Sequence, residues 1–392
     1  MFGSMVQNGK FALCAFPELT QLNNVDFPTL GSPTIPHLSA ISISFKFLGC
    51  KFTQYFYICE IDMIMKRLIL VMLCVVGYSA HAQEKDSLLV MFWNVENFFD
   101  WTDQGTGESD REFSSYGERH WTKKRFYAKC DAIAKSLMWV GDSYGRIPDV
   151  VGFAEVENRG VLRKLLDYTV LRKYDYGIVH YESDDRRGID VALIYRKSVM
   201  KPLSHTLKAP SGMATRDILH VEMRVSGGDT IDFIVNHHPS KYGGEKESEY
   251  KRTEVMYILK ELCDSLHSEG RRIVAMGDFN DTPDGRQFSI VDDMLDNKGV
   301  CLHERGEGTI RYKGKWELID GFLVSRNLST SDMKILRIPF LMTYDRRYPG
   351  EKPHRTYSGP RYLGGVSDHC PIIICILMIV YLKIIMLFLM GC

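Results

Sequence analysis

The stretch that most constrains the fold is residues 273–281, where an apolar run leads directly into a cluster of polar side chains. Residues 273–275 are Ile, Val and Ala, and they predict a buried strand that ends at Asp278 and Asn280. A buried strand of an α/β protein brings its last side chains to one edge of the sheet, where polar groups on a rigid element can converge on a ligand. Gly, Asn and Asp also form turns, so this stretch alone is equally consistent with a catalytic site and with a turn.

Polar side chains also follow or interrupt apolar runs elsewhere in the chain. Asn94 and Glu96 follow a predicted strand at residues 87–93, and as alternate residues of a strand they would share one face. Asp320 lies inside another predicted strand, residues 316–324, where an unpaired buried acid would be costly. The whole set of such side chains is Asn94, Glu96, Glu155, His237, Asp278, Asn280, Asp320, Asp368 and His369.

Strand and helix patterns alternate along the chain. Helical periodicity is clear at residues 124–140 and 247–267, while residues 189–195, 219–225 and 230–235 have the pattern of strands. This alternation predicts an α/β architecture, and one large domain is favoured over two ordinary ones.

The chemistry of the polar set indicates phosphodiester hydrolysis at a metal site. Carboxylate oxygens suit Mg²⁺, Mn²⁺ or Ca²⁺ better than zinc, while imidazole and amide groups suit phosphate oxygens. The adjacent pair Asp368 and His369, together with another acid, has the residue types of an oriented general base. Metal, phosphate-binding groups and base together are the requirements of this reaction.

Each of these residues also has a structural interpretation. Glu155 could be an acid at the start of a helix, and Asn94 could shape a turn. His238 is interpreted as a packed histidine rather than a site residue. The joint occurrence of such groups at successive strand ends favours the functional interpretation.

The amino-acid composition excludes few classes of function. Lys and Arg number 49 and Asp and Glu number 49, so the formal net charge is +0 and no overall positive field exists to hold nucleic acid. The ten cysteines contain no C-x-x-C pair, which argues against a structural zinc site or a thioredoxin-like motif.

The order of the motifs resembles the endonuclease/exonuclease/phosphatase superfamily over roughly residues 88–373. The resemblance implies a four-layer α/β sandwich, in which two packed mixed β-sheets are flanked by helices, with the active site at one edge. The motifs that carry it are residues 93–96, 154–155, 236–237, 277–280, 319–320 and 367–369.

The same resemblance implies a divalent metal ion, Mg²⁺ with Mn²⁺ or Ca²⁺ as alternatives. Glu155 would be its main ligand and Asn94 would assist. Glu96 would support the same ion, and Asp368 would lie near a second metal position.

The implied catalytic groups are His237, Asp278, Asn280, Asp320 and His369. His237 and Asn280 would hold the scissile phosphate, and Asp278 would position or activate water. His369, oriented by Asp320, would be an alternative or cooperating base, so the base is not assigned uniquely.

For the substrate, an endonuclease acting on nucleic acid is the first choice. A phosphomonoesterase or phospholipid phosphodiesterase, of the inositol-phosphate phosphatase or sphingomyelinase type, is the alternative. A noncatalytic binding protein on this scaffold is disfavoured because the acids and histidines are present, and no obligate protein partner is implied. Residues 100–121 predict a long loop bordering the cleft, and Arg186, Arg187, Lys241 and Arg346–Arg347 are either ligand-facing or solvated charge.

The two ends of the chain differ from its middle. Residues 1–64 have no sustained period and are interpreted as a mis-called extension, while residues 65–82 have the pattern of a signal peptide, with a signal anchor or a chance apolar run as the alternative. The domain would span residues 83–377, followed by an apolar tail at 378–392. With Met65 as the true start, the protein would be exported to the periplasm or outside the cell, and the tail could associate with a membrane.

Overall fold

The computed structural model describes residues 87–378, apart from 104, 106, 211 and 242–244. The predicted extension at 1–64, the signal peptide at 65–82 and nearly all of the tail at 378–392 lie outside the described residues. Within the described part of the chain, no helix is long and apolar enough to cross a membrane.

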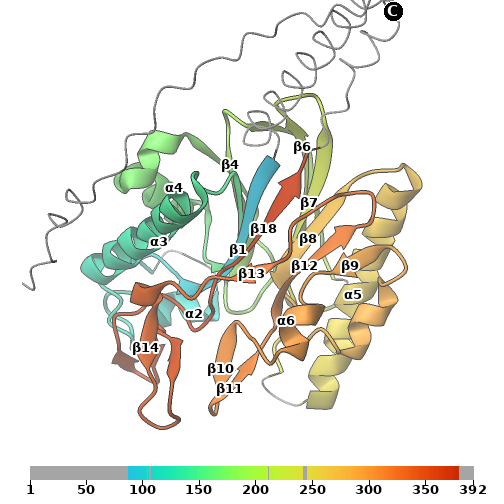
Figure 1. The fold of residues 1–392 in the computed structure, drawn as a ribbon. Coiled ribbons are helices and arrows are strands. Elements are labelled where there is room, and N and C mark those ends of the chain that lie inside the picture. Colours follow the sequence, from blue (N-terminus) through green and yellow to red (C-terminus); the bar gives the residue numbers. More distant parts are fainter. Residues whose placement is uncertain (1–86, 104, 106, 211, 242–244, 379–392) are drawn as a thin grey trace, which may run out of the picture. The chain divides into compact units, whose positions relative to one another are not determined.

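Two six-stranded sheets form the centre of the fold (Figure 1). In the first sheet β1 and β2 run parallel and the other neighbours are antiparallel, so the sheet is mixed. The strand order is β13 (Lys334–Ile335), β18 (Ile372–Leu377), β1 (Ser87–Phe98), β2 (Val150–Val156), β4 (Asp190–Arg196) and β3 (Tyr176–His180).

The second sheet is also mixed, because β7 and β8 are its parallel pair. Its strand order is β5 (Met200–Lys208), β6 (Ile218–Val225), β7 (Thr230–His237), β8 (Ile273–Asp278), β12 (Asp320–Ser325) and β9 (Leu295–Asn297). The two sheets face each other across a buried apolar layer that includes Phe92 and Val150 from the first and Phe233 and Met276 from the second.

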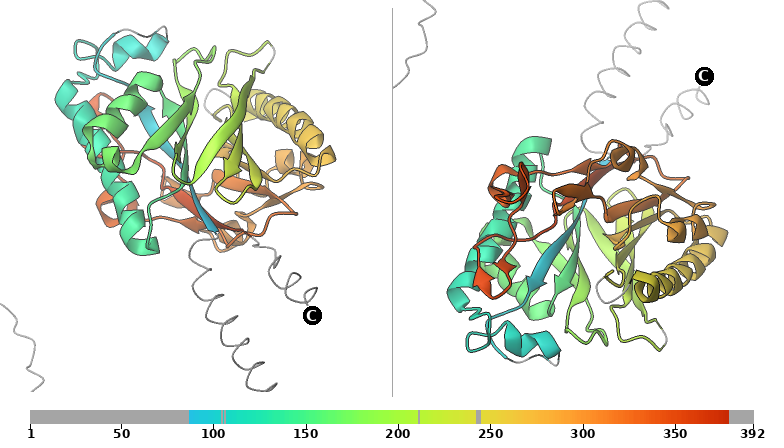
Figure 2. Two further views of the ribbon diagram at one scale, coloured as in Figure 1. Left: turned by 90° about the horizontal axis from the view of Figure 1, so that it is seen from above. Right: turned by 90° about the horizontal axis from the view of Figure 1, so that it is seen from below.

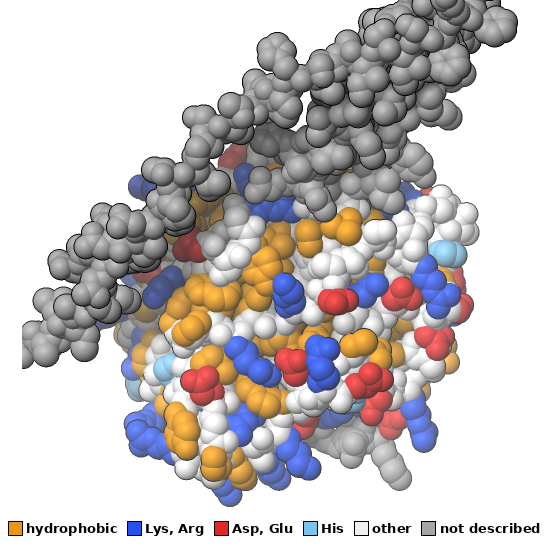
Figure 3. All heavy atoms as spheres, in the orientation of Figure 1, with side chains coloured by type: hydrophobic (Ala, Val, Ile, Leu, Met, Phe, Trp, Pro, Cys, Tyr) orange, Lys and Arg blue, Asp and Glu red, His pale blue; other side chains and the backbone are white. Residues whose placement is uncertain are grey.

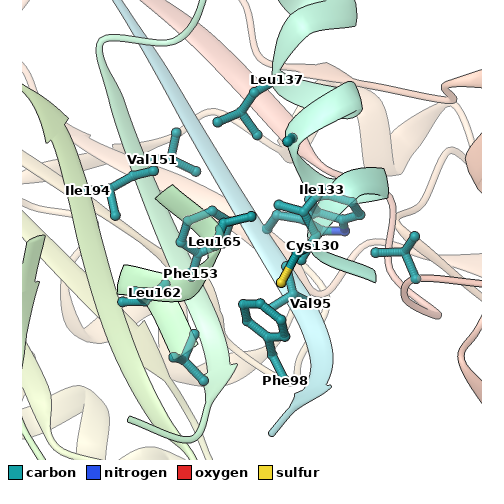
Figure 4. Close-up of a cluster of buried hydrophobic side chains, with 14 of the residues drawn as sticks. Val95, Phe98, Cys130, Ile133, Leu137, Val151, Phe153, Leu162, Leu165 and Ile194 are labelled. Carbon is teal, nitrogen blue, oxygen red and sulfur yellow. The ribbon is translucent and has the colours of Figure 1, made fainter. Parts of the chain in front are cut away.

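Helices cover the outer face of each sheet, as the views from above and below show (Figure 2). α3 (Lys123–Tyr144) and α4 (Arg159–Tyr168) pack on the first sheet, and α5 (Glu245–Ser268) packs on the second. The helix–sheet core beside α3 and α4 contains Phe98, Ile133 and Leu165 from three different elements (Figure 4). The layers are therefore helix, sheet, sheet and helix, and the predicted four-layer α/β sandwich is confirmed.

Local sequence explains the ends of α3. Thr122 is its N-cap, and the Thr122 hydroxyl accepts a hydrogen bond from the backbone N–H of Arg125. Gly145 ends the helix in the left-handed conformation, with φ of 75°, which glycine adopts without steric cost. Phe126, Ile133 and Leu137 lie on its buried face, as the helical periodicity predicts.

Shorter elements connect the layers and extend beyond one end of the sheets. They are α2 (Glu108–Glu112), α6 (Val300–Glu304), η1 (Val170–Tyr174), η2 (Arg286–Ile290), η3 (Pro339–Leu341), and the hairpins β10 (Ile310–Tyr312) with β11 (Lys315–Glu317), β14 (Met342–Tyr344) with β15 (Glu351–Pro353), and β16 (Tyr357–Ser358) with β17 (Arg361–Tyr362).

Two predictions need correction. The single strand predicted at residues 316–324 is two strands, β11 and β12, so Asp320 begins a strand instead of interrupting one. The predicted loop at residues 100–121 contains α2, and its Phe113 and Trp121 are buried in the core, because their apolar area outweighs the polar residues around them.

Candidate active site

The C-terminal ends of β1, β2, β7 and β8 border one cavity of about 390 Å³. Each pair is parallel within its own sheet, so its last side chains reach the same edge. Asn94 and Asp320 lie buried behind the cavity wall. The predicted site residues that line the cavity itself are Glu96, Glu155, His237, Asp278, Asn280, Asp368 and His369.

Bulges at the strand ends turn the key side chains toward the cavity. The pairing of β1 with β2 shifts register between Asn94 and Phe98, and that of β2 with β4 shifts between Ala154 and Val156. The residues inside these shifts have positive φ, 47° at Glu96 and 62° at Glu155. Such strained backbone in residues other than glycine is typical of functional sites, where a bulge re-aims a side chain.

This geometry corrects the expectation that Asn94 and Glu96 share one face of a regular strand. The Asn94 amide donates to Asp278 Oδ2 at 3.0 Å, whereas the Glu96 carboxylate accepts from Arg355 at 3.0 and 3.2 Å. Successive side chains do not alternate between the two faces of the sheet here, because the backbone of Glu96 is not extended.

Glu155 is held from two sides. Its Oε2 accepts a hydrogen bond from the backbone N–H of Asn97 at 2.8 Å and lies 3.4 Å from Arg187 Nη2. Burial alone would raise the pKa of Glu155, but Arg187 and the Asn97 N–H lower it below its ordinary value. Glu155 is therefore a carboxylate at neutral pH.

Glu96 and Asp368 share one arginine. Arg355 Nη2 lies 3.0 Å from Glu96 Oε1 and 3.1 Å from Asp368 Oδ2. Burial and the nearby Asp368 raise the pKa of Glu96 to about 7, although Arg355 opposes this. The Arg355 guanidinium is thus shared by two acids, and its effect on the pKa of Glu96 does not cancel that of burial and Asp368.

A buried lysine contacts the backbone of the strand end that carries Glu96. Lys129 of α3 donates to the backbone carbonyl of Glu96 and to the Thr356 hydroxyl. Burial lowers the pKa of Lys129 to about 8, and the acids Glu96 and Glu155 oppose the decrease. Lys129 therefore anchors the bulge that carries Glu96.

Among the site residues of the second sheet, Asp278 lies close to three other site residues. Its Oδ2 accepts from Asn94 and lies 3.7 Å from His237 Nε2 and 3.8 Å from His369 Nε2. Burial and the nearby Asp320 raise the pKa of Asp278 to about 7, which His369 opposes.

His369 forms a buried pair with Asp320. Its Nδ1 lies 2.8 Å from Asp320 Oδ2, and its backbone carbonyl accepts from the Trp93 indole N–H at 2.9 Å. Burial alone would lower the pKa of His369, but Asp320 and Asp278 raise it well above its ordinary value. The costly buried acid at Asp320 thus has a partner 49 residues away in sequence.

His237, His238 and Asn280 differ in their surroundings. Burial, with Arg216, lowers the pKa of His237 well below its ordinary value, so this ring is neutral. His238 packs edge-to-face on Phe279 with centroids 5.1 Å apart and does not line the cavity, as its structural interpretation predicts. Asn280 has φ of 50°, and its amide donates to the His238 carbonyl at 2.9 Å.

The basic residues of the cavity were only partly identified from sequence. Arg187 lines it, whereas Arg186 pairs with Glu108 and Lys241 with Asp281. Neither Arg346 nor Arg347 is among the lining residues. The cations that sequence reasoning missed are Arg216, Arg311, Lys352 and Arg355.

Two of these missed cations belong to hairpins. Arg311 lies in β10 and Lys352 in β15, and Figure 3 shows Lys and Arg side chains gathered along the lower edge of the face, where Figure 1 places these hairpins. The Arg311 guanidinium donates to the carbonyls of Pro349 at 2.7 Å and Tyr348 at 3.2 Å, so it also joins the hairpins. No strand-end pattern marks these positions in the sequence.

The donor set fits a hard divalent cation. Glu96, Glu155 and Asp368 offer carboxylate oxygens to one cavity, and a bound cation would oppose the increase in the pKa of Glu96 that burial and then Asp368 cause. A second group, Asp278, Asp320 and His369, has ligand atoms within 4.8 Å of one another. The first set fits Mg²⁺ better, because in the second the Asp320 oxygen and the His369 nitrogen already bond to each other.

Comparison with solved structures finds similar folds at low sequence identity. An endonuclease/exonuclease/phosphatase family protein from Bacteroides thetaiotaomicron is 14% identical, with a TM-score of 0.49, covering 75% of this chain and 98% of that one. Humanized D. rerio TDP2 is 15% identical, with a TM-score of 0.49 and coverage of 74% and 98%. The human Nocturnin catalytic domain is 15% identical, with a TM-score of 0.48 and coverage of 74% and 93%.

Sequence comparison gives the family. No curated protein matches the chain. The model of the Endonuclease/Exonuclease/phosphatase family matches residues 89–378, which contain both sheets except the first two residues of β1, and every residue of the cavity. The chain therefore belongs to the endonuclease/exonuclease/phosphatase family.

Proposed function

We propose that this member of a family of phosphoester hydrolases is a divalent-metal-dependent phosphodiesterase, with endonuclease activity as the first choice. The observation that carries the proposal is the convergence on one cavity of four acidic side chains, a histidine that is paired with the buried Asp320, and several cations. Enzymes of this family generally use divalent metals, and Mg²⁺ is the ion that the oxygen donors here suit best.

In this proposal Glu155, Glu96 and Asp368 hold the cation, and Asn94 supports them because its Oδ1 accepts a hydrogen bond from the Glu96 backbone N–H at 2.9 Å. When bound, the cation supplies neutralisation of the phosphate oxygens and of the developing charge on the leaving oxygen. Arg187 and Arg355, which pair with these acids, are about half exposed and can swing toward substrate phosphate.

Asp278 and His369 take different roles because their protonation differs. Asp278, with a pKa of about 7, is suited to accept a proton from the attacking water near neutral pH. His369 is protonated beside Asp320, so it donates a hydrogen bond to the phosphate as charge develops there. His237 and Asn280 line the same wall and orient the scissile group.

The test is a screen of purified protein with Mg²⁺ and with a chelator, against plasmid DNA, RNA, sphingomyelin vesicles and inositol phosphates. We expect chelator-sensitive nicking of DNA that Glu155→Ala abolishes and that Glu118→Ala, which changes an exposed acid, leaves intact. Release of phosphate from inositol phosphates, or of phosphocholine from vesicles, would replace endonuclease by the alternative substrate classes. Hydrolysis that is equal in the chelator would refute metal dependence.

Export is a separate proposal. Translation from Met65 followed by cleavage of residues 65–82 would give a mature chain that begins at Gln83, in the periplasm or outside the cell. Mass spectrometry of the native protein would disprove this if the mature N-terminus lay upstream of Met65.

The tail at residues 378–392 is proposed to follow the last core strand and not to form an anchor. β18 ends at Leu377, so an apolar run that begins at Ile372 is already used in the sheet. We expect truncation after Leu377 to preserve activity and membrane partitioning alike. Loss of membrane attachment on truncation, with activity retained, would contradict this.

A further inference from the structure

A further group of side chains with the chemistry of metal ligands lies at one end of β3 and β4, outside the active-site cavity. His180 ends β3, Asp190 begins β4, and Glu182 lies in the loop between them. Their candidate ligand atoms all lie within 4.8 Å of one another. None of the three lines the cavity of the active site.

The His180 ring is buried and points at the acids. Its side chain is 2% exposed, and among the described residues its Nε2 has no hydrogen-bond partner. Nε2 lies 3.3 Å from Asp190 Oδ2, and Nδ1 lies 3.9 Å from Glu182 Oε1. Two ligands of one tetrahedral zinc ion, each about 2.0–2.1 Å from the metal, lie about 3.3–3.4 Å apart, so the spacing from Nε2 to Oδ2 fits a shared cation.

The charge around this ring is negative. The ligand atoms of two carboxylates, Glu182 and Asp190, lie within 4.8 Å of the candidate ligand nitrogen of the ring. The structure records no ion pair from a described Lys or Arg to Glu182 or Asp190, so a cation would neutralise charge that no such side chain balances.

Asp190 is already positioned for this role. Its Oδ1 accepts hydrogen bonds from the backbone N–H and the hydroxyl of Ser183, which fixes the carboxylate and leaves Oδ2 facing His180. The Glu182 side chain is 69% exposed and can turn without disturbing the core. Two fixed ligands and one adjustable ligand, with solvent in the fourth position, match the number of ligands in an open zinc site.

We propose that His180, Glu182 and Asp190 bind a transition-metal ion, zinc by their chemistry, at a site separate from the proposed catalytic metal. An imidazole nitrogen selects zinc over Mg²⁺, which takes oxygen ligands and water. The inference does not depend on the proposed function of the cavity.

The ion would order the loop that reaches the active site. Between Glu182 and Asp190 this loop contributes Asp185, which pairs with Arg216 at 3.1 Å, and Arg187, which contacts Glu155 and Asn97. Asp190 pairs with Val156, the residue after the bulge at Glu155. Metal binding would therefore stabilise the position of Arg187 beside the proposed catalytic metal.

The test measures zinc bound to the full chain by equilibrium dialysis, with Mg²⁺ in large excess so that the active-site acids are occupied. We expect one zinc ion per chain. Outer-shell substitutions alone cost metal sites about 10–100-fold in affinity, so Glu182→Gln and His180→Ala are each expected to weaken zinc binding at least about 100-fold. Glu118→Gln and His267→Ala change exposed residues and serve as matched controls.

Two further measurements keep the result interpretable. Zinc should slow tryptic cleavage after Arg186, whose side chain is 72% exposed, in the wild-type chain and not in Glu182→Gln. Glu155→Ala should bind zinc as the wild type does, which separates this site from the cavity. Equal zinc binding by the wild type, His180→Ala and Glu182→Gln would overturn the proposal and leave the group as an ion pair.

Discussion

The two sides of the cavity are built differently. On the side of the first sheet, Glu155 and Glu96 are paired with Arg187 and Arg355, whose side chains are 42% and 46% exposed. On the side of the second sheet, Asp278 and Asp320 are almost fully buried and lie beside histidines and amides.

The side of the first sheet, with its half-exposed arginines, is called the adjustable side, and the side of the second sheet is called the buried side. The half-exposed arginines can leave their carboxylates when a cation arrives, because solvent hydrates the guanidinium and the cation takes its place beside the acid. A buried Asp–His pair cannot reorganise cheaply, since a separated partner would leave an unpaired charge in the interior. The first side is therefore suited to bind a metal ion, and the second to hold a reacting group in place.

The largest effect on catalysis is expected from substitutions of Asp278 and His369 on the side of the second sheet. Asp278→Asn and His369→Gln should each lower kcat/KM by about 10³-fold, because the proposed mechanism places both in one proton-transfer and charge-stabilising unit. The double variant should lose little more than either single variant, as residues that act together are not additive. Kinetics on the substrate found in the screen, with circular dichroism to verify folding, would test this. Independent, multiplicative losses would show that the two groups do not form one unit.

The next effect concerns the adjustable side. Glu155→Gln should lower kcat/KM by about 10²-fold and weaken Mn²⁺ binding at least about tenfold, because it removes the charge of the proposed main ligand. Arg187→Gln should not weaken Mn²⁺ binding, since this guanidinium competes with the cation for Glu155. Calorimetric titration measures both without relying on turnover. Weaker binding in Arg187→Gln than in Glu155→Gln would reverse the assignment.

A smaller effect is expected from Lys129, the buried lysine that contacts the backbone of Glu96 on the adjustable side. Lys129→Met removes the buried donor to the Glu96 carbonyl and should cost about 1–3 kcal/mol in the free energy of unfolding. Activity should fall by about tenfold through displacement of Glu96. Denaturant titration and kinetics would measure both effects, with Lys124→Met as the exposed control on the same helix. Unchanged stability would mean that Lys129 does not anchor the bulge.

The smallest effect is a dependence of the free energy of unfolding on pH, caused by the buried His238. Burial lowers the pKa of His238 from 6.5 to about 3, so below pH 6.5 the unfolded chain binds a proton that the folded chain does not. Stability should therefore decrease as the pH falls, by up to about 2 kcal/mol between pH 6.5 and about pH 5.

The matched variants for this last prediction are His238→Gln, which removes the titrating ring, and His267→Gln, which changes an exposed histidine. Urea titrations at several pH values should give a flatter profile for His238→Gln alone. A profile as steep as that of the wild type would assign the pH dependence to other groups.

Much of the fold followed from local patterns. The apolar runs and their polar ends predicted β1, β2, β7 and β8 because strand period and turn chemistry depend on near neighbours. The run after Pro371 was correctly predicted as the last core strand, β18, which pairs with β1. β3 and β5 were missed, because β3 has only five residues and β5 is largely exposed, so neither has a strong apolar pattern.

The partners of the site residues could not be predicted in this way. Arg355 pairs with Glu96 across 259 positions of sequence, and Arg187 with Glu155 across 32. No local pattern links such residues, because only chain folding brings them together. The bulges that aim Glu96 and Glu155 depend likewise on the register between neighbouring strands.

The sequence by itself determined which chemical groups end the central strands and that they belong to an α/β fold, since both depend on the order of residues along one segment. Only the tertiary structure decided which arginines face those groups, which acids share an arginine, and that His180 meets Asp190 away from the cavity. The reason is physical: charge and hydrogen bonding act across space, and the distances between these atoms are fixed by the packing of the two sheets.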